Sequence, residues 1–548
     1  MARLLTQHNT MSFENFILRD IPRIISDSRN VIRVLKNKEN NEYKTKVYFY
    51  LGGKDGKGIQ YKGPKLNPND CRLDGLTYQG ILEVKIEIIV IHGDEKPISK
   101  IDTIDLVKIP TMLHSKYCVL KDKTDNELSS LGESSHERGG YFIVKGLEKV
   151  ILSQEDSATN IIYTRIESVK ENLIATVDSR YGSNAVERFS IVYDKKTDTI
   201  FATIPYLKGS IPIIILFRAL GLESEKQIIE SICGKNLSSN LSKVLGDALI
   251  PSINEVNQIY SQEIALRCLS ILTKVQADKS NKNAIKWKGN LLYILNNRFL
   301  PHVGTDVDDY MVALKNKANY LGYMVKHLLT TQLGLREITD RDSLVYKRVR
   351  LPGEIMNDMF RDFYEEYLKN IKNQTDKLIE LDKKTEISAK SILKDISESY
   401  NSILNSSEFQ RNIDNSFMGR WGKNPSSKRN EGVLQGYLRH SFMEAMSHLR
   451  RVHLNLPDGP NTMEQRRLHN SQWGYYCPVE TPDGASIGTH KHLCQTCTIS
   501  VEYDSEKLIN WIKDDAASPP VADKERDLHI IFVNGDLIGK HSNPKKFV

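Results

Sequence analysis

The chain has few cysteines for its length, with seven among 548 residues. An odd, sparse set is unlike the disulfide framework of a small secreted protein, so we expect a reducing, intracellular compartment. The most apolar stretch, residues 211–222, is interrupted by Arg218. It is also shorter than the roughly 20 residues that cross a bilayer. Residues 1–13 contain no apolar run of the signal-peptide type. The sequence therefore predicts a soluble protein with no membrane partner.

Complete motifs for nucleotide or metal chemistry are also missing. Residues 53–58 are rich in glycine, but Ile59 follows where a phosphate-binding loop needs Lys and then Ser or Thr. We interpret this segment as a flexible hairpin loop. The acidic residues Asp306, Asp308 and Asp309 could hold Mg²⁺, but no phosphate-binding segment or activated nucleophile lies near them in the sequence. We interpret them as an exposed loop.

One cysteine pair has the spacing of half a zinc site. Cys494 and Cys497 form a C-x-x-C motif, and His490 and His492 precede it closely, which leaves a compact site open. A second pair of similar spacing does not occur in the chain. We interpret these cysteines as buried or incidental.

The charge of the chain is unevenly distributed. The formal net charge is +7, a mild excess that by itself only hints at a polyanionic partner. Residues 420–467, however, contain nine Lys or Arg against four Asp or Glu, so most of the excess lies in this short segment. This distribution directs attention to the segment as a possible anion-binding surface.

The hydrophobic pattern changes type along the chain. Residues 84–88 alternate apolar and charged side chains, as a strand with one wet face does. Two apolar runs, residues 141–144 and 150–152, flank a Lys-Gly turn and predict a hairpin. Apolar residues between 354 and 371 recur every three or four positions and predict a helix with one buried face. Strands and helices on this scale, in a chain long enough for about three to five domains, predict an α+β multidomain fold.

The basic segment itself predicts a helix followed by a loop. Apolar spacing from residue 433 to 452 is helical and places Arg450 and Arg451 at the C-terminal end, where the helix dipole favours cations. A turn-rich loop follows, and Arg466 and Arg467 come after it. Such guanidinium groups can bind phosphates in bidentate fashion. The residues alone leave two readings open, a nucleic-acid contact and an ordinary basic surface.

Two longer stretches carry a resemblance to a known family. Residues 447–451 read SHLRR, and residues 467–484 read RLHNSQWGYYCPVETPDG. They resemble the SHLRR and RQLHNTHWGLVCPAETPEG motifs in the second-largest, β-like subunit of multisubunit DNA-directed RNA polymerases. The motifs are closest in form to eukaryotic, archaeal and giant-virus enzymes. Asp483 departs from the family's glutamate.

Weaker matches extend the resemblance over nearly the whole chain. Residues 139–150, GGYFIVKGLEKV, are similar to the family's GGYFIINGSEKV, and residues 340–351 are similar to its DDRDHFGKKRLDL segment. The resemblance implies the N-terminal half of the subunit, with a lobe inserted into a discontinuous protrusion. The implied domains are the protrusion at 1–172 and 351–411, the lobe at 173–350, the fork at 412–498, and the start of the first external domain at 499–548.

The resemblance also implies roles for particular residues. Arg450, Arg451, Arg466 and Arg467 are expected to contact nucleic-acid phosphates or the fork's own acids. A second group is expected to hold the shape of the fork: His469, Trp473, Glu480, Asp483 and Gly484. No catalytic residue is expected in this chain, and the fork would separate DNA strands beside an active site formed elsewhere.

Cofactors and partners follow from the same resemblance. The catalytic Mg²⁺ is expected on the largest subunit and zinc only in the missing C-terminal half, so this chain would bind neither. Expected partners are the largest subunit, the C-terminal remainder of the β-like subunit, other polymerase subunits, the DNA template and the RNA–DNA hybrid. The location would be the nucleus for a cellular eukaryotic enzyme, or the virion or host cytoplasm for a viral one. The alternative is a non-catalytic DNA-binding or assembly protein derived from such a subunit.

Overall fold

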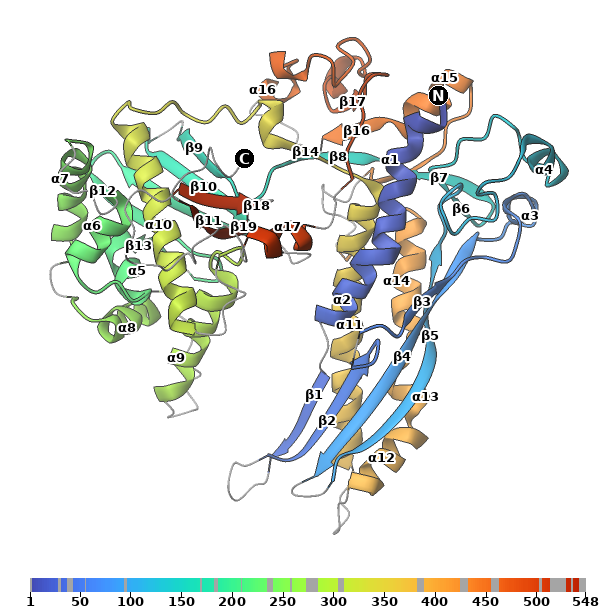
Figure 1. Ribbon diagram of the computed structural model, residues 1–548, viewed down its shortest axis with the longest axis horizontal. Helices are drawn as coiled ribbons and strands as arrows, with labels where there is room; N and C mark the ends of the chain where they lie inside the picture. Colours follow the sequence, from blue (N-terminus) through green and yellow to red (C-terminus); the bar gives the residue numbers. More distant parts are fainter. Residues whose placement is uncertain are drawn as a thin grey trace. The chain divides into compact units, whose positions relative to one another are not determined.

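The computed structural model divides the chain into two compact units (Figure 1). The first contains residues 1–156 and 342–501, and the second contains residues 157–341 and 502–548. The described residues are 2–27, 31–36, 43–54, 56–92, 96–167, 170–181, 186–207, 209–233, 240–256, 259–272, 284–303, 310–381, 389–423, 432–454, 463–501, 505–512, 529–533 and 536–541. Within these residues, no helix combines the length and apolarity that crossing a membrane requires. The mixture of helices and sheets is that of an α+β fold, as predicted.

A five-stranded antiparallel sheet forms the long part of the first unit. Its central strand, β4 (Gln79–His92), pairs with β2 (Tyr43–Leu51) and β3 (Ile59–Lys62) along one edge and with β5 (Ile98–Pro110) along the other. The edge strand β1 (Val31–Lys36) pairs with β2. Side chains of β4 alternate between buried and less buried positions, which confirms the strand predicted from residues 84–88.

The glycine-rich segment between β2 and β3 differs from the predicted hairpin loop. Both flanking strands pair with β4, so the segment leaves and rejoins one edge of the sheet. Gly52 N donates to Lys85 O over 2.8 Å, and Lys85 N donates to Gly58 O over 2.7 Å. The two glycines therefore continue the ladder on either side of the excursion, while Asp55 lies outside the described residues.

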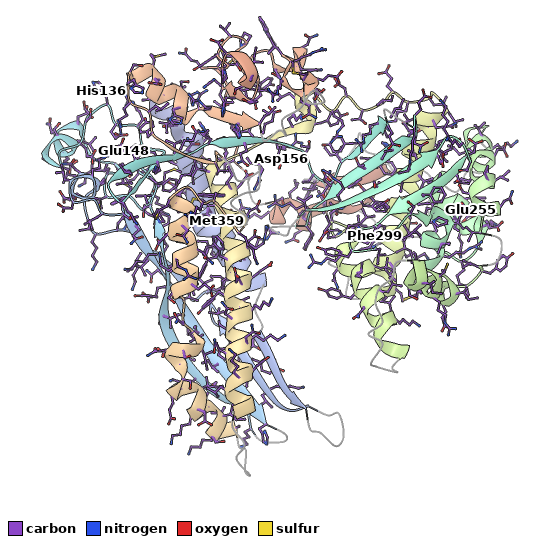
Figure 2. All side chains as sticks on the ribbon, turned by 180° about the vertical axis from the view of Figure 1, so that it is seen from behind. His136, Glu148, Asp156, Glu255, Phe299 and Met359 are labelled. Carbon is purple, nitrogen blue, oxygen red and sulfur yellow. The ribbon has the colours of Figure 1, made fainter. Side chains whose placement is uncertain are left out.

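Helices pack on this sheet and complete the main core of the first unit. The long helix α11 (Pro352–Leu381) confirms the predicted amphipathic helix, since Met356, Met359, Phe360 and Tyr364 are all buried (Figure 2). The neighbouring α12 (Ala389–Glu398) buries two isoleucines, Ile392 and Ile396. The other helices around this core are α1 (Ala2–Asn15), α2 (Ile21–Asp27), α13 (Tyr400–Ile403) and α14 (Ser407–Phe417).

The first unit also contains a smaller, three-stranded sheet. Strands β6 (Phe142–Val144) and β7 (Leu147–Ile151) form the predicted hairpin, and β15 (Leu434–Gly436) pairs with β7. Lys145 and Gly146 both have positive φ, 49° and 75°, as the tight turn of a two-residue hairpin requires. Two short helices accompany this sheet, α3 (Pro68–Leu73) and α4 (Asp125–Ser130).

The predicted helix from 433 to 452 is wrong. The structure divides this segment into β15, the helix α15 (Phe442–Leu449) and the strand β16 (Arg451–Leu454). The helix begins where the Ser441 side chain accepts a hydrogen bond from Glu444 N over 3.1 Å, an N-cap that the sequence already contained. The apolar residues of the two strands and the short helix together have the spacing of a single amphipathic helix, which is why the sequence pattern predicted one.

A four-stranded sheet collects residues from distant parts of the first unit. Its order is β14 (Lys347–Arg350), β8 (Ser153–Ser157), β16 and β17 (His490–His492). Strand β16 runs parallel to β8 and antiparallel to β17. This sheet carries Arg451, which belongs to the basic segment identified in the sequence.

The second unit has its own antiparallel sheet and core. The sheet order is β13 (Ile211–Pro212), β12 (Thr199–Thr203), β11 (Glu187–Asp194), β10 (Leu173–Ser179) and β9 (Ile162–Ile166). Its helices are α5 (Ile213–Ala219), α6 (Glu225–Cys233), α7 (Asn240–Asn254), α8 (Gln262–Leu272), α9 (Ala284–Tyr293) and α10 (Tyr310–Gln332). The described C-terminal elements are α17 (Glu506–Trp511), β18 (His529–Val533) and β19 (Asp536–His541).

The inserted unit begins earlier than the predicted 173–350. Strand β9 pairs with β10 and so belongs to this sheet, whereas β14 joins β8 in the first unit. Phe299 packs edge-to-face against Phe189 inside this core, with ring centroids 4.9 Å apart (Figure 2). The family's names for these units stay a prediction.

Candidate nucleic-acid interface

The strands β16 and β17 form a short ribbon with a basic face. In their register Arg451 is opposite His492, Val452 is opposite Lys491, and His453 is opposite His490. Because side chains alternate along a strand, Arg451 and the three histidines share one face, while Val452 and Lys491 share the other. The sequence had pointed to the arginines, but only the strand pairing brings the histidines to them.

The other face of the ribbon is held by a buried ion pair. Lys491 Nζ lies 3.1 Å from Glu155 Oε2, and the two side chains are 8% and 3% exposed. Glu155 belongs to β8, the parallel neighbour of β16, so the pair fixes the ribbon to the sheet. Lys491 also lies over the Tyr476 ring, 5.3 Å from its centroid. Sequence reasoning missed this pair because 336 positions separate the two residues.

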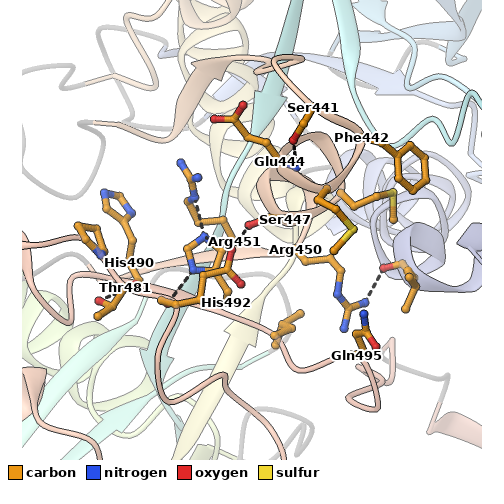
Figure 3. A pocket seen from close by; sticks show the side chains of 16 residues that line it. Ser441, Phe442, Glu444, Ser447, Arg450, Arg451, Thr481, His490, His492 and Gln495 are labelled. Atoms are coloured by element: carbon orange, nitrogen blue, oxygen red, sulfur yellow. Dashed lines mark hydrogen bonds and ion pairs between the residues drawn. The ribbon is translucent and has the colours of Figure 1, made fainter.

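A groove of about 930 Å³ opens beside the basic face (Figure 3). The helix α15 contributes apolar side chains to its wall, among them Phe442 and Met446. Arg451 and Glu480 contribute charge, and Leu5 of α1 completes the lining. A wall with an apolar part and a cationic part suits a ligand that has both rings and anionic groups.

Arg450 has a structural position in this arrangement. Its side chain is buried, and Nη1 donates to Leu5 O over 2.7 Å (Figure 3). Nη2 donates to Cys494 O over 2.5 Å and to Cys497 O over 3.2 Å. The guanidinium group therefore already donates to three carbonyl groups. A phosphate contact by Arg450 stays a prediction that its burial does not favour.

Arg451 begins a short chain of hydrogen bonds. Its Nε donates to His492 Nε2 over 3.0 Å, and His492 Nδ1 lies 2.9 Å from the carbonyl oxygen of Glu480 (Figure 3). This pattern requires a neutral His492 with its proton on Nδ1. Burial lowers the pKa of His492, in agreement with that form. The Glu480 carboxylate in turn accepts a hydrogen bond from the Ser447 hydroxyl group.

Two further histidines near the ribbon are neutral for the same reason. Burial lowers the pKa of His448 and of His490 to about 4. The Nδ1 atom of His448 accepts a hydrogen bond from Leu438 N over 3.2 Å, which is possible only when that nitrogen carries no proton. At neutral pH, His490 and His492 therefore add no positive charge to this face beside Arg451.

The second arginine pair lies at the end of α16 (Met463–Arg466). Arg466 donates to Ala485 O, and Gly488 packs so closely that a Cβ there would lie 2.3 Å from Arg466 O. Arg467 is exposed, and within the described part of the chain its side chain has no hydrogen-bond or ion-pair partner. Of the four predicted arginines, Arg467 is the one most open to an external phosphate.

Of the five residues expected to hold the shape of this region, three take part in local hydrogen bonds or in a turn, and the side chains of the other two are exposed. The Nδ1 atom of His469 accepts from Ser471 N over 3.2 Å and so caps the 3₁₀ turn Asn470–Gln472. Glu480 bonds Ser447, and Gly484 has φ of 70°. Trp473, by contrast, is 81% exposed. Asp483 is exposed too and makes no side-chain cap bond to the following 3₁₀ turn, Gly484–Ser486.

The candidate metal residues are placed as follows. Asp306, Asp308 and Asp309 lie outside the described residues, as does the loop 455–462. Among the residues that are described, no group of three or more His, Cys, Asp or Glu is arranged to hold a metal ion. Cys494 and Cys497 lie in a turn beside Arg450, whereas His490 pairs with His453 through their Nδ1 atoms, 3.1 Å apart.

A charged network that the sequence did not reveal lies around the Tyr141 hydroxyl group. Arg439 donates to Glu137 over 2.9 Å and to the Tyr141 hydroxyl over 2.8 Å, and it also pairs with Glu148. Arg72 donates to Glu148 over 2.8 Å and to the same hydroxyl over 2.7 Å. The network ties the segment after β15 to the β6–β7 hairpin.

Comparison with known proteins places these features in one family. The family model described as RNA polymerase beta subunit matches residues 4–398, and the model for RNA polymerase Rpb2, domain 3, matches residues 436–499. The second match contains α15, β16, β17 and the four arginines.

Three relatives illustrate the extent of the similarity. DNA-directed RNA polymerase II subunit RPB2 of Meyerozyma guilliermondii is 29% identical over 98% of this chain and 44% of its own length. DNA-directed RNA polymerase subunit Rpo2 of Sulfolobus acidocaldarius is 29% identical over 100% of this chain and 46% of its own. DNA-directed RNA polymerase subunit Rpo2N of Methanocaldococcus jannaschii is 29% identical over 93% of this chain and 95% of its own.

The chain thus spans less than half the length of the yeast relative and nearly the whole of the archaeal Rpo2N. The first family match covers well over half of the chain. The chain therefore belongs to the RNA polymerase beta subunit family.

Proposed function

We propose that this chain is the N-terminal part of the second-largest subunit of a DNA-directed RNA polymerase. The observation that carries the proposal is the pair of family matches, which follow one another along the chain and end at the basic ribbon. Relatives in yeast and archaea are named as DNA-directed RNA polymerase subunits. The near-complete coverage of an archaeal subunit supports a chain of about this length working as one subunit of a complex.

In that complex the chain contributes binding surface and no catalytic group. Nucleotidyl transfer of this kind uses two metal ions that stabilise the attacking and leaving oxygens. We place the Mg²⁺ ions on the largest subunit, and zinc in the C-terminal remainder of the β-like subunit. Protrusion, lobe and fork are the family's names for the parts that line the DNA cleft. We assign the fork role to residues 412–498.

The proposed nucleic-acid contact rests on the accessibility of the arginines. Arg467 is exposed, and Arg451 lines the groove with its guanidinium group half-buried. A phosphate contact neutralises charge and releases counterions, so binding through these residues falls steeply with salt. The exposed Trp473 offers a ring for stacking on a base, a contact that tolerates any sequence.

The proposed partners are the largest subunit, the remainder of the β-like subunit, other polymerase subunits, the DNA template and the RNA–DNA hybrid. The proposed location follows the enzyme, which is nuclear in a cellular eukaryote and in the virion or host cytoplasm for a virus. A tagged chain purified from its native source, analysed by mass spectrometry and assayed for RNA synthesis, tests the proposed partners and the proposed role in RNA synthesis.

We expect a largest subunit and a chain carrying the remaining half to co-purify with template-dependent RNA synthesis. A chain that purifies alone and without activity would contradict the polymerase proposal. That result would leave a DNA-binding or assembly protein derived from a polymerase subunit.

A further inference from the structure

Cys494 and Cys497 are the first and fourth residues of a single β-turn after β17. Cys497 N donates to Cys494 O over 2.9 Å, the hydrogen bond that closes a four-residue turn. In such a turn the first and fourth Cα atoms lie within about 7 Å. A disulfide bridges Cα atoms about 4.4–6.8 Å apart. Both thiols are free and half-buried. The turn therefore holds the two cysteines at a Cα separation that a disulfide can bridge.

The turn is fixed by contacts from outside it. The guanidinium group of Arg450 donates to the carbonyl oxygens of both cysteines, over 2.5 and 3.2 Å. On the side toward β17, Cys494 N donates to Tyr475 O over 2.9 Å. Because these bonds hold the main chain, closing the sulfur bridge costs little further ordering.

The other five cysteines do not share this geometry. Cys71 and Cys118 are buried, and Cys233 and Cys268 lie in the second unit. Cys477 is the nearest competitor, because its N donates to His492 O over 2.8 Å on the strand opposite. It is therefore a diagonal neighbour of Cys494 rather than its turn partner.

We propose that Cys494 and Cys497 form a reversible dithiol–disulfide site whose oxidant is a low-molecular-weight disulfide such as oxidised glutathione. The Cys494 thiolate attacks one glutathione sulfur, the sulfur–sulfur bond breaks, and one glutathione leaves and takes up a proton. The Cys497 thiolate then attacks the Cys494 sulfur, and the second glutathione leaves in the same way. Two thiols lose two electrons and two protons, and one glutathione disulfide becomes two thiols.

The surroundings assign the order of the two steps. Burial raises the pKa of the Cys497 thiol, which packs on the small core formed by Val452, Tyr476 and Leu493. Because this packing restricts access to the Cys497 sulfur, Cys494 is the attacking group and Cys497 resolves the mixed disulfide. Leu493 and Gln495 line the groove, so the oxidation state of the turn stiffens or relaxes one wall of it. This site does not depend on the polymerase proposal.

Peptide mapping of the full chain tests the site directly. Trypsin cuts after Lys491 and Lys507, so both cysteines fall on peptide 492–507, whereas Cys477 falls on peptide 468–491. The reduced chain is treated with excess oxidised glutathione, and remaining thiols are then blocked with N-ethylmaleimide. We expect two fewer alkylations than the seven of the reduced chain. Peptide 492–507 should be unlabelled and about 2 Da lighter than its dithiol form.

Three variants separate this outcome from its alternatives. C497S should keep glutathione on residue 494, C494S should form no bridge, and the neighbouring control C477S should behave like the wild type. A chain that keeps all seven thiols under excess oxidant would overturn the proposal. A product that links peptides 468–491 and 492–507 would do the same, because it would assign the bridge to Cys477. The wild-type peptide map requires no variant to fold.

Discussion

Lys491 and Glu155 link two strands of one sheet across the strand that lies between them, with Nζ and Oε2 3.1 Å apart and both side chains almost fully buried. Strand β8 carries Glu155, and β17 carries Lys491, with β16 between them in the sheet. The basic ribbon therefore depends on a contact made by its hidden face. Several consequences for stability and binding can be measured.

Replacing Lys491 by Met should open the ribbon. The change leaves the Glu155 carboxylate buried without a counter-charge, which costs about 3–5 kcal/mol of local stability. The double variant K491M/E155L should recover most of this loss, because it buries no charge. Hydrogen exchange at residues 451–454 and 490–492 measures the local opening free energy. Equal destabilisation in the single and double variants would contradict the ion-pair account.

Replacing Arg467 by Gln should weaken nucleic-acid binding by the purified complex without affecting its stability. Each lost phosphate contact lowers the slope of log binding constant against log salt by about 0.9 for duplex DNA. Arg411 is a matched control, since it is an exposed arginine on α14 that pairs with the neighbouring Glu408. A salt titration of binding by wild type, R467Q and R411Q checks the expectation. Equal slopes in all three would assign Arg467 no contact.

Replacing Arg450 by Lys should instead reduce stability and leave the salt slope unchanged. Lysine keeps the charge but cannot reach three carbonyl groups with a planar fork. The bond to Leu5 O joins the ribbon to α1, so protection from hydrogen exchange should fall in residues 2–15. Unchanged protection of residues 2–15 in R450K would contradict the structural account of Arg450.

Acid should destabilise the first unit through its buried histidines. His448 has a pKa lowered by burial to about 4, below the ordinary value of about 6.5, so the unfolded chain binds more protons between these values. Its contribution is present above pH 6.5 and is lost as the pH falls toward 4. The loss amounts to at most about 3 kcal/mol. Stability of wild type and H448Q should converge as the pH is lowered through this window, and parallel curves would contradict it.

Regular elements with one buried face could be predicted from the sequence, and contacts between distant segments could not. The hairpin at 141–152 and the helix α11 carry their own local patterns, two apolar runs around a Lys-Gly turn and a spacing of three to four. The segment 433–452 misled because β15, α15 and β16 together reproduce helical spacing. The cap at Ser441 was the local signal that would have corrected it.

The same distinction holds at the candidate site. Motif matching identified the arginines, but the burial of Arg450 depends on α1, whose residues are some 445 positions away. The alignment of His453 with His490, and of Lys491 with Glu155, depends on strand register. Register follows from packing of the whole sheet, and a single sequence does not state it.

Two glycines near the second arginine pair allow a matched test of that packing. Gly474 and Gly488 both have positive φ, 82° and 72°, so alanine at either position strains the backbone, at a cost of about 1 kcal/mol. They differ in their surroundings, because a Cβ at Gly474 meets nothing within 4 Å, while one at Gly488 would lie 2.3 Å from Arg466 O. G488A must therefore displace the main chain that positions Arg466 and Arg467, and G474A need not. We expect G488A to weaken nucleic-acid binding several-fold more than G474A at equal salt, measured on the purified complex. Equal binding by the two variants would show that the packing of Gly488 on Arg466 does not position the arginine pair.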